Sequence, residues 1–108
     1  MIGSTVDIHI DIVAWHDDHQ PGLVECRLID AHGKAWTFVE KVPIVTEAML
    51  ESTTSYPQPG TIRGIVVDTP QATDGQEIVT IDTTLPWRIE DLDCVTRFDV
   101  RPDQLAIC

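Results

Sequence analysis

The chain has 108 residues, of which 43% are hydrophobic and 23% are charged, and these values exclude a disordered, collagen-like or disulfide-dense protein. Its 18 acidic and 7 basic residues give a net charge of -11, which argues against nucleic acid or an anionic membrane as a partner. The length suits one compact β-rich domain over residues 1–108. No apolar run approaches the roughly 18 residues of a membrane span, and the first residues lack a signal-peptide pattern, so we expect no membrane segment.

The first predicted element is a strand over residues 6–12, where β-branched apolar side chains alternate with acidic and histidine side chains. A period of two is typical of a strand with one buried and one solvated face. Residues 14–22 are rich in turn formers and end in Pro-Gly, so they predict a chain reversal. Residues 23–30 and 35–40 then predict a hairpin, in which Gly33 supplies the positive φ of the turn.

The middle of the chain interrupts the strands. Residues 46–51 predict a short helix, because Thr46 is a good N-cap residue and helix formers follow it. Residues 52–60 contain Pro57 and Pro59 and predict a loop.

The last third of the chain predicts a second hairpin and a final strand. Residues 61–68 and 76–83 pair in the hairpin, and residues 85–90 form a proline-containing corner. A last strand is expected over residues 94–101, followed by a helical turn at residues 102–105.

Together these elements predict an all-β fold, a small antiparallel barrel or two-layer β fold of about six strands with one or two short helices. Gly64, in the middle of a predicted strand, indicates a bulge or a close backbone approach. The predicted core consists of Val6, Ile8, Ile10, Ile12, Val24, Cys26, Leu28, Trp36, Phe38, Ile62, Val66, Ile78, Phe98 and Val100.

Four stretches give the sequence a recognisable pattern over most of its length, namely residues 36–43, 59–60, 86–90 and 96–100. In these stretches the sequence resembles a group of small, uncharacterised, β-rich bacterial proteins. The resemblance implies a β-rich bacterial cytoplasmic protein, and it assigns a functional role to none of these residues.

Histidines near the amino end are the candidate metal ligands. His9 lies on the first predicted strand, and His16 and His19 lie in the following turn. A His-x-x-His pair in a turn lacks the register that fixes a zinc site on a helix, and no cysteine or third fixed ligand stands beside it. We therefore interpret these residues as a solvated strand face and a polar loop, and predict no metal and no other cofactor.

Motifs for catalysis are missing from the sequence. There is no GxSxG elbow, and the glycines form no phosphate-binding loop. Cys26 and Cys94 alternate in phase with apolar neighbours, so we expect both to be inert core residues. Three cysteines without CxxC spacing favour a reducing compartment, and we expect a cytoplasmic protein that is not an enzyme.

The acidic surface is the remaining candidate for function. Asp17, Asp18, Glu90, Asp91 and Asp93 cluster in predicted loops, where carboxylates can meet Arg or Lys of a partner. Trp87, in the proline corner, is expected to be partly exposed and to contribute to binding.

These features predict a non-catalytic, acidic protein-interaction module with a basic protein partner. An immunity-type inhibitor that masks a basic enzyme is one form of such a module. The alternatives are a small-molecule or divalent-metal binding protein, or a minor enzyme whose site the sequence does not reveal.

Overall fold

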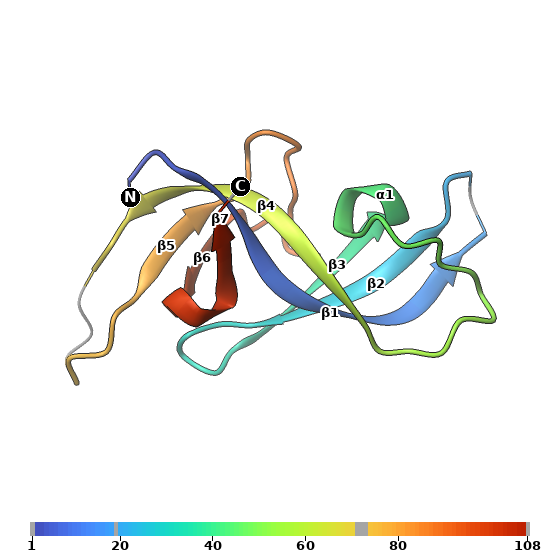
Figure 1. The fold of residues 1–108 in the computed structure, drawn as a ribbon, viewed down its shortest axis with the longest axis horizontal. Helices are drawn as coiled ribbons and strands as arrows, with labels where there is room; N and C mark the ends of the chain where they lie inside the picture. The colour runs from blue at the N-terminus through green and yellow to red at the C-terminus, as the bar shows by residue number, and fades with distance from the viewer. Residues whose placement is uncertain (1, 19, 71–73, 108) are drawn as a thin grey trace.

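The computed structural model describes residues 2–18, 20–70 and 74–107, and within them seven strands form one antiparallel sheet that curls into a half-barrel (Figure 1). The strand order is β3-β2-β1-β4-β5-β6, and β7 pairs with β1. The all-β prediction is therefore confirmed. The elements are β1 (Thr5–Asp17), β2 (Leu23–Ile29), β3 (Ala35–Lys41), α1 (Val42–Val45), β4 (Gln58–Asp68), β5 (Val79–Asp82), β6 (Arg97–Val100), the 3-10 helix η1 (Pro102–Gln104) and β7 (Leu105–Ile107).

Strand β1 is the central strand of the sheet, because it pairs with β2, β4 and β7. Its register with β2 shifts between Ile12 and Ala14 and again between Trp15 and Asp17. Such bulges bend a strand and increase its twist. They allow β1 to run on through Trp15 to Asp17, so the turn predicted from residue 14 begins later than expected.

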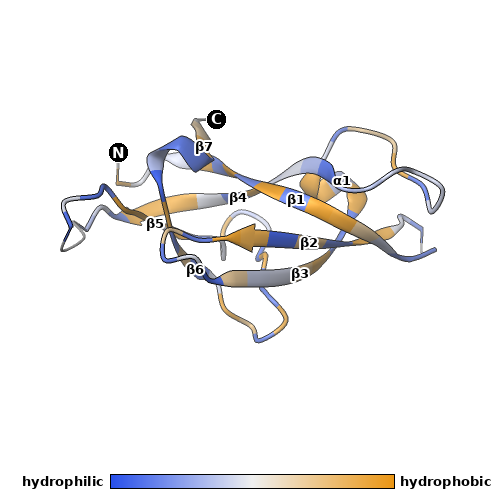
Figure 2. Cartoon of the chain, turned by 90° about the horizontal axis from the view of Figure 1, so that it is seen from below, coloured by the Kyte–Doolittle hydropathy of each residue, from blue (hydrophilic) through white to orange (hydrophobic). Residues whose placement is uncertain are grey.

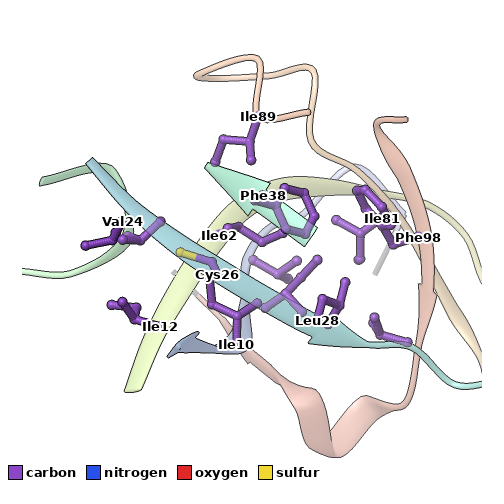
Figure 3. Close-up of a cluster of buried hydrophobic side chains, with 14 of the residues drawn as sticks. Ile10, Ile12, Val24, Cys26, Leu28, Phe38, Ile62, Ile81, Ile89 and Phe98 are labelled. Carbon is purple, nitrogen blue, oxygen red and sulfur yellow. The ribbon is translucent and has the colours of Figure 1, made fainter. Parts of the chain in front are cut away.

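The core fills the inside of the curl (Figure 3). Within it the ring of Phe98 packs edge-on against the rings of Phe38 and Trp36, at centroid distances of 5.4 and 5.3 Å. All of the predicted core residues are buried except Trp36, which is half-buried and whose Nε1 donates to Asp30 Oδ2. Figure 2 shows hydrophobic stretches on β1, β4 and α1. Buried hydrophobic residues that were not predicted are Val42, Val45, Val79, Ile81 and Ile89.

The helix predicted at residues 46–51 is wrong. The helix is α1, which starts four residues earlier, contains Pro43 in its first turn and buries Val42 and Val45. Proline is compatible with a first helical turn, since its missing N–H would have no partner there. Thr46, expected as the N-cap, instead ends the helix, and its N–H donates to Val42 O at 3.1 Å. A helix at 46–51 has no buried apolar stripe to stabilise it.

Several strand boundaries also differ from the prediction, including the start of β5 at Val79 instead of residue 76. Strand β4 begins at Gln58, within the expected loop. At Pro59 it pairs with β1 on one side only, because its pairing with β5 begins at Ile65. A strand position with one free edge tolerates a proline. Strand β6 begins only at Arg97, and the short β7 was not predicted. The expected helical turn at residues 102–105 is confirmed as η1.

Gly64 confirms the predicted close approach. A Cβ at this position would lie 2.6 Å from Ile81 Cγ2 and 2.8 Å from Asp82 O, so only glycine lets β5 sit this near to β4. Among the described residues, none of the helices is long and apolar enough to cross a membrane.

Candidate functional site

The predicted acidic residues lie in two separate places. Asp17 ends β1 and Asp18 follows it, whereas Glu90, Asp91 and Asp93 belong to the segment between β5 and β6. Figures 1 and 2 both show the end of β1 apart from that segment. The structure therefore does not bring the five carboxylates together.

Asp91 is not a surface residue, contrary to expectation. The residue is only 7% exposed, and its Oδ1 accepts hydrogen bonds from the N–H groups of Asp93 at 3.0 Å and Val95 at 2.7 Å. The carboxylate therefore shapes the loop and is not available to a partner.

Trp87 is 45% exposed, which confirms the expected partial exposure. Its ring lies over the Arg63 guanidinium, at 5.0 Å from Cζ to the ring centroid. Arg63 also holds Asp7 through both carboxylate oxygens, at 2.9 and 3.2 Å. Trp87 is thus packed on β4, while Glu90 pairs with Arg88 at 3.3 Å.

The described surface is hollowed at the α1 end of the molecule, in what we call the acidic groove. It consists of two adjoining hollows of about 690 and 430 Å³. Both are lined by Gln20, Gly22, Leu50 and Glu51, so they form one continuous depression. The remaining lining residues are Trp15, Asp18, Pro21, Val42, Pro43, Thr46, Glu47, Ala48, Met49 and Ser52.

The lining of the acidic groove combines negative charge with apolar surface. It contains the carboxylates of Asp18, Glu47 and Glu51, all on exposed residues, and no Lys, Arg or His is among its described lining residues. Met49, which is 94% exposed, and the half-buried Leu50 supply hydrophobic contact area beside the acids.

The wall formed by β1 depends on Trp15. Its Nε1 donates to Asp18 Oδ1 at 2.8 Å, which fixes the position of that carboxylate. The ring lies against Gly22, where an added Cβ would overlap it, so only glycine allows the tryptophan to occupy this position. The two β-bulges at residues 12–17 turn this end of β1 into the wall.

The opposite wall is held by hydrogen bonds around Glu51. Its N–H donates to Thr54 Oγ1 at 2.9 Å, and its carbonyl oxygen accepts from Tyr56 Oη at 2.8 Å and from the Thr54 N–H at 3.1 Å. The groove is therefore a formed feature whose rim has a defined backbone position.

Sequence reasoning found only Asp18 of these lining acids. Glu47 and Glu51 were hidden inside the segment predicted as a helix, where acidic residues four apart are ordinary. The signal that could have revealed them is that Met49 and Leu50 alone in this segment are large and apolar, too few for a buried helix face.

The histidines do not form a metal site in the described part of the chain. His9 projects from the outer side of β1, and His16 lies near the strand's end, seven residues further on. His19 lies outside the described residues. Among those that are described, no group of three or more His, Cys, Asp or Glu is arranged to hold a metal ion.

A second polar cluster surrounds the turn between β2 and β3. His32 Nε2 lies 3.0 Å from Asp99 Oδ2, and Thr80 Oγ1 donates to Asp99 Oδ1 at 2.6 Å. The hydrogen bond with Asp99 raises the pKa of His32. Partial burial opposes ionisation of Asp99, but the hydrogen bonds from Thr80 and His32 lower the pKa of its carboxyl. This cluster ties the turn to β5 and β6.

The two described cysteines differ from each other. Cys26 is buried as predicted, and burial, with smaller contributions from Glu40 and Glu25, raises its thiol pKa to about 12. Cys94 is exposed and has φ 65°, so the core position predicted for it is wrong. The left-handed conformation ends the alternation that the prediction assumed. The negative charge of Glu90 and its hydrogen bond to the thiol raise the pKa of Cys94, and Asp91 and Asp93 add smaller effects in the same direction.

A comparison of the chain with protein-family models, curated proteins and solved structures finds no match.

Proposed function

We propose that this chain is a non-catalytic protein-interaction module of the cytoplasm that binds a basic segment of a partner protein in the acidic groove. The observation that carries the proposal is the lining of the groove, in which three carboxylates and exposed apolar side chains stand together and the described lining residues include no Lys, Arg or His.

The chemistry of the lining suits lysine and arginine. Carboxylates accept strong, charge-assisted hydrogen bonds from ammonium and guanidinium groups. The aliphatic stems of Lys and Arg, and apolar neighbours in the same segment, would cover Met49 and Leu50. Two adjoining hollows offer an extended segment positions for successive side chains.

The charge of the whole molecule favours the same partner. A net charge of -11 attracts a basic protein at long range and raises the rate of encounter. Inhibition of a basic enzyme by masking, as expected of an immunity-type protein, is one outcome of such binding. Cys26 and Cys94 are free thiols, which supports a reducing compartment.

The test uses a short fluorescein-labelled peptide of alternating lysine and leucine, with its fluorescence anisotropy measured against protein concentration. The groove variant carries Asp18→Asn, Glu47→Gln and Glu51→Gln, and the side-chain amide introduced by Asp18→Asn keeps an oxygen that accepts from Trp15. A control variant carries Asp68→Asn, Asp74→Asn and Glu77→Gln, three exposed acids outside the groove. Both variants have a net charge of -8, that is -11 plus 3.

We expect the groove variant to bind the peptide about tenfold more weakly, since three partly solvated ion pairs together contribute roughly 1.5 kcal/mol. The control variant should lose at most a small part of its affinity. Equal losses in the two variants would show that the peptide responds to net charge alone, and the proposal would then be rejected. A basic nuclease in place of the peptide tests the immunity-type form of the proposal.

A further inference from the structure

The outer face of the half-barrel carries a second surface, which we call the Leu85 patch. It consists of Ile65 and Val67 on β4, Thr84 and Leu85 after β5, and Trp87 in the loop that follows. Leu85 is 62% exposed and Trp87 45% exposed. The residues Ile65, Val67, Asp82, Thr84 and Leu85 line a hollow of about 310 Å³.

The pattern of β4 explains why the patch is apolar. Along this strand Ile62, Gly64 and Val66 point into the core, so Arg63, Ile65 and Val67 point outward. The outer face of the neighbouring β1 is polar, with Thr5 opposite Ile65 and Asp7 opposite Arg63. Ile65 and Val67, at successive outward positions of β4, are therefore apolar where the adjacent strand presents polar side chains to solvent.

The charges around the Leu85 patch are paired with one another. Arg63 holds Asp7 at 2.9 Å and Arg97 holds Asp82 at 3.1 Å. In the same loop Arg88 lies 3.3 Å from Glu90. Three of the seven basic residues are thus gathered here, each beside a carboxylate, in a molecule whose net charge is -11.

We propose that the Leu85 patch binds a second copy of this chain, forming a two-fold symmetric dimer. A partner with a high charge of either sign gains nothing from a patch whose charges are already paired. Two copies of a strongly acidic protein, however, repel each other least where their charges are balanced.

The shape of the patch supports self-association. Leu85 stands on the rim of the hollow that it helps to line. In a two-fold interface each surface meets its own copy, so a projecting side chain and a receptor hollow must occur on the same patch. A two-fold axis beside this rim would place Leu85 of each copy over the hollow of the other, with Trp87 covering the edge.

The dimer and the acidic groove respond to salt in opposite ways. Salt screens the repulsion between two acidic copies and strengthens apolar contact, so the dimer should tighten as salt rises. Binding of a basic peptide in the groove should weaken under the same conditions. The proposal goes beyond the proposed function, and each can fail without the other.

The test is sedimentation velocity of the full chain over a range of protein and sodium chloride concentrations. We expect a monomer–dimer equilibrium that shifts toward dimer with both. Leu85→Asp should abolish the dimer, and Ile65→Thr, which keeps a β-branched residue on the strand, should weaken it at least tenfold. Leu92→Asp is the control, because Leu92 is 64% exposed in the same loop but its backbone is bonded to Thr37 of β3.

A wild-type chain that stays monomeric at every concentration and salt would overturn the proposal. Equal dissociation by Leu92→Asp and Leu85→Asp would also overturn it, since the dimer would then use another surface. In either case the peptide-binding result for the groove would stand unchanged.

Discussion

Asp30 shows how a single buried carboxylate can organise a turn. The residue is 4% exposed, and its two oxygens accept hydrogen bonds from the N–H groups of His32 and Lys34 and from Trp36 Nε1, each at 2.9 Å. A buried charge is stable only when such donors surround it. Lys34 Nζ also lies 4.0 Å from the Trp36 ring centroid, so the turn and the start of β3 form one unit.

We predict that Asp30→Ala lowers the free energy of unfolding by about 3 kcal/mol, because three donors lose their acceptor. Asp30→Asn should cost about half as much, since its remaining oxygen can still accept from the two backbone N–H groups. Urea denaturation measures both. The exposed Asp11→Ala should change stability by less than about 0.5 kcal/mol. A loss at Asp11 equal to that at Asp30 would contradict this account.

Cys94 provides a second prediction for a single residue. Its thiol is exposed, but Glu90 and the neighbouring carboxylates raise its pKa and so lower the fraction of thiolate at neutral pH. We expect iodoacetamide to alkylate Cys94 slowly in the wild type and severalfold faster in Glu90→Gln. Mass spectrometry of the peptide that contains Cys94 measures both rates. Cys26, with a pKa of about 12, should remain unmodified in the folded protein. If Glu90→Gln leaves the rate at Cys94 unchanged, access rather than charge controls the thiol.

At the scale of elements, the two ends of the strand order are linked across the opening of the half-barrel. The N–H of Leu92 donates to Thr37 O on β3 at 3.0 Å, and that of Ala31 donates to Asp99 O on β6 at 2.8 Å. Edge strands expose unpaired backbone groups that invite association with other chains. These hydrogen bonds cover part of both edges, and the His32–Asp99 pair lies at the same seam.

The His32–Asp99 pair makes this seam sensitive to pH. The raised pKa of His32 gives stability that is fully present below its unfolded value of 6.5 and is lost as pH rises through the folded value. The lowered pKa of Asp99 gives stability that is present above 3.8 and is lost as pH falls through the folded value. The pair therefore stabilises the fold most between these limits.

We predict that wild type loses stability relative to His32→Gln when pH rises above about 6.5. The comparison is made by urea denaturation at a series of pH values. In a proton NMR titration of His32, Asp99→Asn should bring the imidazole pKa back toward its ordinary value. An unchanged titration in Asp99→Asn would mean that this carboxylate does not stabilise the imidazolium.

The sequence allowed the pairing of elements to be predicted better than their ends. Strict alternation identified the core of β1, and the two hairpins were found because turn residues separate β-branched runs. The helix was misplaced because propensity favoured residues 46–51, whereas burial of Val42 and Val45 decided the outcome. The short β7 could not be predicted, since three residues acquire strand conformation only from their partner β1.

The candidate site was harder to predict than the fold. Asp18 was identified, but the groove depends on β-bulges and on the packing of Trp15 against Gly22, which bring together segments that are not adjacent in sequence. No local pattern encodes such a contact. The buried position of Asp91 was missed for the same reason, because the sequence does not show that its carboxylate folds back on its own loop.

At the scale of the whole molecule, the unbalanced charge opposes compactness. A net charge of -11 on 108 residues repels itself, and dissolved salt screens that repulsion. We predict that sodium chloride raises the free energy of unfolding by on the order of 1 kcal/mol, or roughly 4 °C in the melting temperature. Thermal denaturation followed by circular dichroism measures this shift. The two variants with a net charge of -8 should respond less, and a melting temperature that falls with salt would show that the surface ion pairs dominate.

Strand β7 joins β1 across a very long stretch of sequence. Val6 pairs with Ile107, so almost all of the described chain lies between the two partners. Contacts between such distant residues close the largest loops and slow the search for the native topology. Before residues 105–107 dock, the amino-terminal half of β1 can join β4 but not β7. A partly folded chain therefore has an open strand edge on β1, and we expect this intermediate to be most prone to aggregation.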